Sequence, residues 1–207
     1  MPVIDDIALM TLLAGGILAL VAIGLVLMRR HAQRLHGRLA PAFELGTTRR
    51  ASTLPPAIEG LFRGYACRYA IEQRSQYSAG GANLRIRTAS PLTWGASRRG
   101  IAASVLASIG VLRDIAIGDE AIDRRLRLTA GDAPMLQSLL GQQRTRDALR
   151  ALADSEGFAS VRVRARRADL RWAPRRPDLD ESPEGLRHRL AAAVDLLAAC
   201  GCPPLTG

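Results

Sequence analysis

Residues 161–172 read VRVRARRADLRW, in which small or apolar residues alternate with arginine. Successive side chains of a β-strand point to opposite faces of a sheet, so this pattern predicts a hairpin with one apolar face and one arginine-bearing face. We expect the hairpin to span residues 158–174. Its outward face would carry Arg162, Arg164 and Arg171, and the rest of the sequence must indicate what these guanidinium groups meet.

Other segments show the same period of two. Residues 65–71, 84–88 and 124–129 alternate in the same way and are predicted strands. The segment SAGGAN, residues 78–83, predicts a turn between the first two. Residues 101–117 are apolar and are compatible with either a short helix or a strand.

Two helical regions complete the predicted body. Asp132 is a candidate N-cap, with Pro134 in the first turn, for a helical stretch to about Leu152 that is interrupted near Gly141. Ser182 and Pro183 open a last helix that ends at Gly201. The apolar face of this last helix comprises Leu186, Leu190, Ala193, Val194 and Leu197. We therefore predict an α+β fold, with an antiparallel sheet packed on one face by two or three helices.

The predicted sheet has two chemically different faces. The inward set is Leu84, Ile86, Leu126, Leu128, Val161, Val163, Leu170 and Trp172. The outward set is Arg85, Arg87, Arg125, Arg127, Arg162, Arg164 and Arg171. Charges on one face of a sheet often do no more than contact water. We expect few acids among these positions, which favours an anionic partner instead.

The composition also favours an anionic partner. The chain has 207 residues, a net charge of +10 and 29 basic residues, all of them arginine. A planar guanidinium suits phosphate and carboxylate groups, so the partner could be lipid headgroups, an acidic protein or nucleic acid. Aromatic residues make up only 4% of the chain and no known nucleic-acid-binding signature occurs, so we expect no specific nucleic acid partner. The three cysteines, Cys67, Cys200 and Cys202, predict no disulfide framework.

An uncharged apolar run lies near the N-terminus. Residues 7–28 read IALMTLLAGGILALVAIGLVLM, which at about 1.5 Å per residue can cross the ~30 Å hydrocarbon core of a bilayer. A cleaved signal peptide would begin with positive charge, whereas Asp5 and Asp6 precede this run, so we expect an uncleaved anchor. Four arginines follow the run, and the positive-inside rule then predicts an outer N-terminus and a cytoplasmic body at the bacterial inner membrane.

The span carries a stripe of small residues. Gly15, Ala19 and Ala22 are spaced by four and then three, which places them on one helix face where another helix could approach closely. They are candidate helix-packing residues. The alternative is that glycine and alanine are simply common in membrane helices.

A basic segment follows the span. Arg29, Arg30, Arg34 and Arg38 are candidate contacts for anionic headgroups, because each basic residue near an anionic leaflet contributes about 1 kcal/mol of attraction. The span helix is expected to continue to about residue 39, with a linker beyond it. The predicted organisation is an extracytoplasmic N-terminus (1–6), a transmembrane helix (7–28), a basic juxtamembrane segment and linker (29–56), a cytoplasmic α+β domain (57–200) and a tail (201–207).

No catalytic signature is present in the sequence. It contains no nucleotide-binding loop, nucleophile elbow or zinc-protease motif, so we predict no catalytic residue, no cofactor and no metal site. Asp119, Glu120 and Asp123 form a dense acidic cluster directly before Arg124 and Arg125. No histidine lies nearby in sequence, and we interpret this cluster as turn capping and ion pairing.

The acidic cluster belongs to the segment GDEAIDRRLRLT, residues 118–129. This segment, with the helix and hairpin after it, resembles a broad group of uncharacterised bacterial single-pass membrane-anchored proteins. Those proteins carry an acidic turn of the Gly-Asp-x-x-Phe-Asp type, and Ile122 stands here where an aromatic residue is usual. The resemblance covers about residues 57–175 and implies an α+β cytoplasmic body without a known activity. In architecture alone, the chain is similar to the capping subunit of bacterial photosynthetic reaction centres and to supernumerary respiratory subunits.

These observations favour a non-enzymatic accessory subunit of a larger membrane complex. Its expected partners are other transmembrane subunits and anionic lipid headgroups. The alternatives are a membrane-tethered binding module for anionic lipid or nucleic acid, and an enzyme of a kind that the motifs do not reveal.

We predict that a reporter fused at Gly207 is active in the cytoplasm, because acidic residues precede the span and arginines follow it. The measurement is a pair of fusions, one to alkaline phosphatase, which is active only outside the cytoplasm, and one to a fluorescent protein that matures only inside. Phosphatase activity without fluorescence would contradict the predicted orientation.

Overall fold

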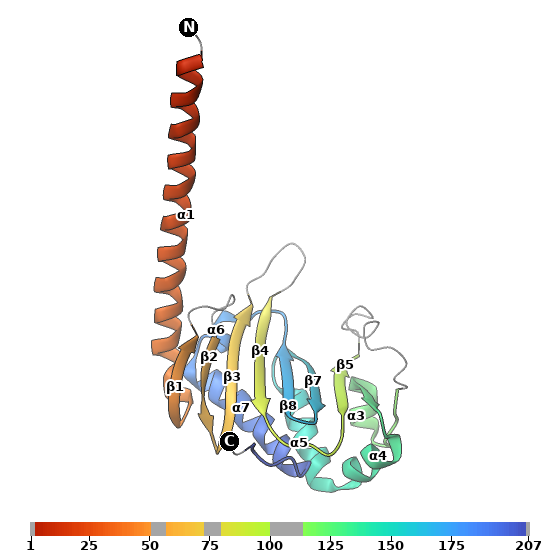
Figure 1. The fold of residues 1–207 in the computed structure, drawn as a ribbon. Helices are drawn as coiled ribbons and strands as arrows, with labels where there is room; N and C mark the ends of the chain where they lie inside the picture. The colour runs from red at the N-terminus through yellow and green to blue at the C-terminus, as the bar shows by residue number, and fades with distance from the viewer. Residues whose placement is uncertain (1–2, 51–56, 73–79, 100–113, 206–207) are drawn as a thin grey trace. The chain divides into compact units, whose positions relative to one another are not determined.

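The computed structural model describes residues 3–50, 57–72, 80–99 and 114–205, and Figure 1 shows its ribbon. The chain divides into two compact units, Met1–Gly37 and Arg38–Gly207.

The first unit consists of helix α1 (Val3–Leu39), which continues two residues into the second unit. It is long and apolar enough to cross a membrane, with a mean hydropathy of 2.3 over its most apolar window. Between Leu12 and Met28, eleven large apolar side chains are exposed, and they lie on all sides of the helix. The predicted continuation of the helix to residue 39 is confirmed.

The second unit is built around an eight-stranded antiparallel sheet. Its strands are β1 (Leu45–Arg50), β2 (Ala57–Phe62), β3 (Tyr65–Glu72), β4 (Gly81–Arg87), β5 (Trp94–Arg98), β6 (Leu126–Ala130), β7 (Phe158–Arg164) and β8 (Arg167–Trp172). Its helices are the short 3-10 helix η1 (Ala40–Ala42), then α3 (Glu120–Arg125), α4 (Ala133–Gly141), α5 (Gln143–Asp154), α6 (Pro177–Asp180) and α7 (Pro183–Ala199).

The predicted hairpin is confirmed as β7 and β8, and it lies inside the sheet. The strand order is β1-β2-β3-β4-β8-β7-β5-β6, and it can be followed from β1 to β5 in Figure 1. Strand β8 pairs with β4, and β7 pairs with β5. The hairpin therefore joins the four N-terminal strands to β5 and β6.

One face of this sheet forms the core, as the α+β prediction requires. All eight residues of the predicted inward set are buried. Helices α5 and α7 lie on this face (Figure 1). The apolar side of α7 contributes Leu186, Leu190 and Leu197, each with an exposed fraction of 1% or less. Burial of side chains of this size stabilises a fold by about 1.5–3 kcal/mol each.

The predicted helix starts are also confirmed. The carboxylate of Asp132 accepts a hydrogen bond from the backbone N–H of Met135 at 2.9 Å. The hydroxyl of Ser182 accepts one from the N–H of Gly185 at 2.9 Å. The interruption near Gly141 separates α4 from α5. Local capping chemistry therefore sets these boundaries, as the sequence indicated.

Three local predictions differ from the structure. The linker expected beyond residue 39 contains β1, whose sequence LGTTRR lacks an apolar alternation and which is placed by its pairing with β2. Of the turn predicted over residues 78–83, residues 78 and 79 lie outside the described residues, and residues 81–83 belong to β4. Arg124 and Arg125 belong to α3 and not to a strand, because Asp119 caps a helical turn there. Of residues 101–117, only 114–117 are described, and they form neither helix nor strand.

The last described residues pack into the body, although we expected a tail after residue 200. Cys200 and Cys202 are buried, and the carbonyl oxygen of Cys202 accepts hydrogen bonds from the hydroxyls of Tyr65 (2.8 Å) and Thr88 (3.0 Å). Burial raises the pKa of Cys67 and of Cys200 to about 12. These thiols therefore stay protonated and poorly nucleophilic at neutral pH.

We predict that Gly81→Ala destabilises the body, because β4 approaches β8 closely at this point. A Cβ atom at Gly81 would lie 2.2 Å from the carbonyl oxygen of Trp172, so the strand pair would have to separate locally. The free energy of unfolding should fall by about 2 kcal/mol, measured by denaturant titration. Gly141→Ala is the control, since a Cβ there meets nothing within 4 Å and a change within about 0.5 kcal/mol is expected. Equal losses in the two variants would contradict the close-approach argument.

Candidate functional site

The sheet face opposite the helices carries the arginines, and we call it the open face. It is defined by Arg68, Arg85, Arg87, Arg127, Arg162, Arg164, Arg167 and Arg171. Directly opposed residues of antiparallel strands point to the same side of a sheet. Arg68, Arg85, Asp169 and Arg162 form one such row across β3, β4, β8 and β7.

A second row contains only arginine. Arg87, Arg167 and Arg164 lie opposite one another on β4, β8 and β7. Like charges at directly opposed positions are unfavourable. The open face therefore concentrates positive charge around the β7–β8 hairpin.

Carboxylates also lie on this face, which corrects the expectation that acids are nearly absent from it. One carboxylate oxygen of Asp169 accepts a hydrogen bond from Nε of Arg85 at 2.8 Å, and the other lies 3.0 Å from Nε of Arg167 in an ion pair. Further pairs join Arg171 to Glu72 (3.6 Å), Arg68 to Glu59 (3.7 Å) and Arg127 to Asp114 (3.6 Å). The sequence could not show these pairs, because they depend on which strands are neighbours.

The predicted contact residues of the hairpin fall into two classes. Arg171 pairs with Glu72, and its Nε is buried without a hydrogen-bond partner in the described structure. Arg162 and Arg164 are partly exposed, and within the described ranges neither forms an ion pair. Arg125, expected on the outward face, lies on α3 and pairs with Asp154 instead. Of the predicted contact residues of the hairpin, Arg162 and Arg164 therefore lie close to each other on β7 and carry charge that no described carboxylate pairs with.

The other predicted contact residues belong to α1. Arg29, Arg30, Arg34 and Arg38 are all exposed, and the last three are spaced by four along one face of the helix. The stripe of Gly15, Ala19 and Ala22 is exposed as well. A Cβ at Gly15 would meet nothing within 4 Å, so that face of the helix has room for a neighbour.

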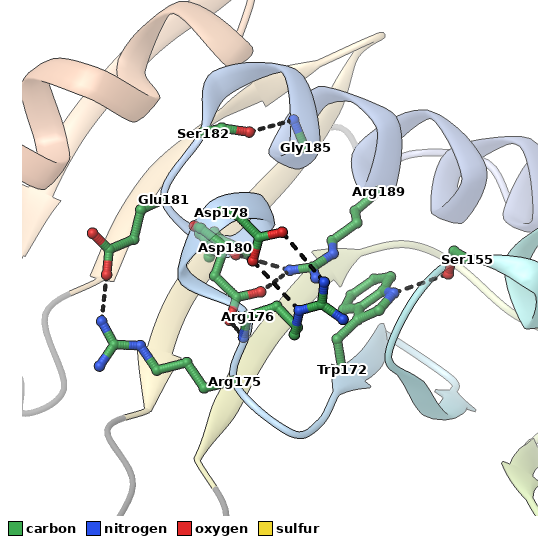
Figure 2. Close-up of polar contacts among 11 residues, drawn as sticks. Ser155, Trp172, Arg175, Arg176, Asp178, Asp180, Glu181, Ser182, Gly185 and Arg189 are labelled. Atoms are coloured by element: carbon green, nitrogen blue, oxygen red, sulfur yellow. Dashed lines mark hydrogen bonds and ion pairs between the residues drawn. The ribbon is translucent and has the colours of Figure 1, made fainter.

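A buried ion pair, which the sequence analysis missed, holds α6 and α7 to the sheet (Figure 2). Arg189 and Asp180 are 3% and 1% exposed, and Nη1 of Arg189 lies 2.5 Å from Oδ1 of Asp180. The second carboxylate oxygen of Asp180 accepts a hydrogen bond from the backbone N–H of Arg176 at 2.7 Å. The hydroxyl of Tyr69 donates to the carbonyl oxygen of Asp180 at 3.0 Å and accepts from Arg189 at 3.2 Å.

An aromatic contact extends this network to the hairpin. The guanidinium carbon of Arg189 lies 5.0 Å from the centre of the Trp172 ring, within the range of a cation–π contact. The indole N–H of Trp172 donates to the hydroxyl of Ser155 at 3.0 Å (Figure 2). Burial raises the pKa of Tyr69, so its phenol stays protonated. Both oxygens of the Asp180 carboxylate are engaged inside the protein, so the network stabilises the fold rather than offering a reactive group.

The acidic cluster is a structural turn, as predicted. Asp119 caps α3 by accepting the N–H of Ile122 at 3.3 Å and pairs with Arg150. Asp123 accepts the N–H groups of Ile117 at 3.2 Å and Gly118 at 3.0 Å. Across the described ranges, no group of three or more His, Cys, Asp or Glu residues could hold a metal ion.

A surface groove of about 720 Å³ lies between η1, the β2–β3 turn and the start of α7. Phe43, Phe62 and Pro183 provide apolar walls, whereas Glu184 and Arg187 carry opposite charges. Because both signs of charge line it, this groove does not select a charge class of ligand.

We predict that Asp180→Asn lowers the free energy of unfolding by about 3 kcal/mol, because it leaves the Arg189 guanidinium buried without a counter-charge. Denaturant unfolding of the full chain in detergent measures this loss. The control is Asp178→Asn in the same helix, since that carboxylate is 61% exposed and its ion pair with Arg176 faces solvent. The control should leave stability nearly unchanged, and an equal effect in both variants would contradict the prediction.

Comparisons with known proteins give little further information. No protein-family model matches the chain, and no curated protein matches it. The crystal structure of the mycobacterial trehalose monomycolate transport factor A, TtfA, is similar at 14% sequence identity with a TM-score of 0.47. That alignment covers 89% of this chain and 99% of the other. A likeness this distant carries no argument about fold or function.

Proposed function

We propose that this protein is a non-enzymatic, single-pass accessory subunit that stabilises a larger bacterial membrane complex, of the photosynthetic or respiratory type. Its transmembrane helix docks on the helices of other subunits, and its basic body contacts the complex on the cytoplasmic side. The protein resides in the inner membrane with its N-terminus outside.

The surface of α1 is the observation that supports this proposal most strongly. Its large apolar side chains are exposed on every side, and a helix that is apolar all round requires a membrane or a protein core around it. The stripe of Gly15, Ala19 and Ala22 is exposed too, although small residues offer little apolar area to lipid. Such a stripe permits close backbone approach by a second helix.

The body supports a docking role more than a catalytic one. Its buried Asp180, Arg189 and Tyr69 are bonded to one another, and Asp119 and Asp123 cap a turn. Its distinctive surface is the open face, where eight arginines are interspersed with fewer carboxylates. Charge complementarity at such a face steers association and fixes orientation.

A membrane-tethered lipid-binding module is the second candidate. The observation that favours it is the row of Arg30, Arg34 and Arg38 along one face of α1, since basic residues next to a span attract anionic headgroups. Either role can use α1 as the membrane anchor. An accessory subunit should co-purify with other membrane proteins, whereas a lipid-binding module should not.

We predict that Gly15→Leu with Ala19→Leu weakens assembly without preventing membrane insertion, because the span stays apolar while the close-approach stripe is filled. The amount of complex, measured by blue-native electrophoresis of gently solubilised membranes, should fall roughly fivefold. Carbonate extraction should show normal insertion.

The matched control is Gly24→Leu. At 100° per residue, position 24 lies about opposite to Gly15 on the helix, and a Cβ there also meets nothing within 4 Å. If the stripe variant assembles as well as this control, the stripe contacts lipid and the docking role of the span is wrong.

A further inference from the structure

We infer that Arg162, Arg164 and Arg167 form a binding site for a carboxylate group on the surface of a protein partner. We call these three residues the arginine triad. The inference rests on the proposed function and deepens it, since it names the partner chemistry that the basic body meets.

The geometry of the hairpin brings the triad together. Arg162 and Arg164 lie two residues apart on β7, which places them on the same face at about 7 Å. Arg167 lies directly opposite Arg164 on β8, where Cβ atoms are typically about 5 Å apart. Three guanidinium groups thus share one small area of the open face.

This area has more positive charge than its own carboxylates neutralise. Asp169 lies opposite Arg162, but its two oxygens already pair with Arg85 and Arg167. Arg162 and Arg164 remain without an ion pair among the described residues. An additional carboxylate would therefore meet two unpaired guanidiniums, whose planar donors match its two oxygens.

The carboxylates of the open face favour a protein over a polyanion. A membrane surface or a nucleic acid backbone carries closely spaced negative charge, and some of that charge would lie against Asp169 and Glu72 as well as against the arginines. Such contacts between like charges oppose binding. A folded protein can present one carboxylate to the triad and cationic or neutral groups to Asp169.

The absence of lysine from the sequence permits a direct test. Arg164→Lys, made in the full chain in its native membrane, places a single side-chain amine at the triad. A water-soluble carbodiimide then joins this amine to any carboxylate in contact with it as an amide, which mass spectrometry can locate. We expect a cross-link to an Asp or Glu of another protein.

Arg144→Lys is the control for this experiment, because Arg144 is exposed on α5 and far along the chain from the hairpin. Cross-links to the same partner from both variants would overturn the inference. So would the absence of a cross-link at position 164, or cross-links there that reach only carboxylates of this chain.

A second experiment separates the protein partner from lipid. Replacing Arg162, Arg164 and Arg167 together by glutamine should weaken association with the complex at least about tenfold, while binding to phosphatidylglycerol vesicles stays unchanged. Replacing Arg29, Arg30 and Arg34 by glutamine removes the same charge and should weaken vesicle binding but not the complex. The opposite pattern would overturn the inference in favour of a lipid site.

The same experiments distinguish this inference from the proposed function. If the wild-type protein migrates alone in native electrophoresis, the accessory role and the triad inference both fail. If a complex forms and the triad variant leaves it unchanged, only the inference fails. Melting curves of the triad variant must match the wild type, as expected for partly exposed surface arginines.

Discussion

The pairing of the central hairpin with β4 on one side and β5 on the other is the interaction on which the rest of this body depends. Without it, the four N-terminal strands and the β5–β6 pair would be two separate sheets, and a two-stranded pair is only marginally stable by itself. The pairing fixes Val161, Val163, Leu170 and Trp172 in the core. Because strand side chains alternate, the same constraint forces the intervening arginines onto the opposite face.

Arginine has two different roles in this fold, and the role of each arginine depends on whether its side chain is buried or exposed to solvent. Arg189 is buried against Asp180 and over the Trp172 ring, so it connects the last helix to the end of the hairpin. Removing one partner of such a pair lowers the free energy of unfolding, because the remaining charge is buried away from water without a counter-charge. The arginines of the open face are partly exposed and contribute little to stability. Their positions are therefore free to serve recognition.

Much of the fold could be predicted because it follows from local rules. The hairpin, β3 and the inward set follow from a period of two, and the starts of α4 and α7 follow from the side chains of Asp132 and Ser182. The strand order, β1 and the carboxylate partners of the arginines could not be predicted. These features depend on long-range pairing, which leaves no trace in a local pattern. For the same reason, Arg162 and Arg164 were expected on the outward face, but the special position of Arg167 became visible only from the register.

The charge patterns of the two units indicate how one residue type can meet two anionic environments. The segment RRHAQRLHGRL, residues 29–39, contains arginine and no acid, which suits the uniform negative charge of a lipid leaflet. The open face alternates arginine with Asp169, Glu72 and Glu59, and a mixed pattern is complementary only to another mixed pattern. A uniform surface cannot satisfy both signs at once, whereas a folded protein surface can. The interspersed acids thus lower affinity for any polyanion, whereas Arg162 and Arg164, which form no ion pair among the described residues, favour the addition of a single carboxylate.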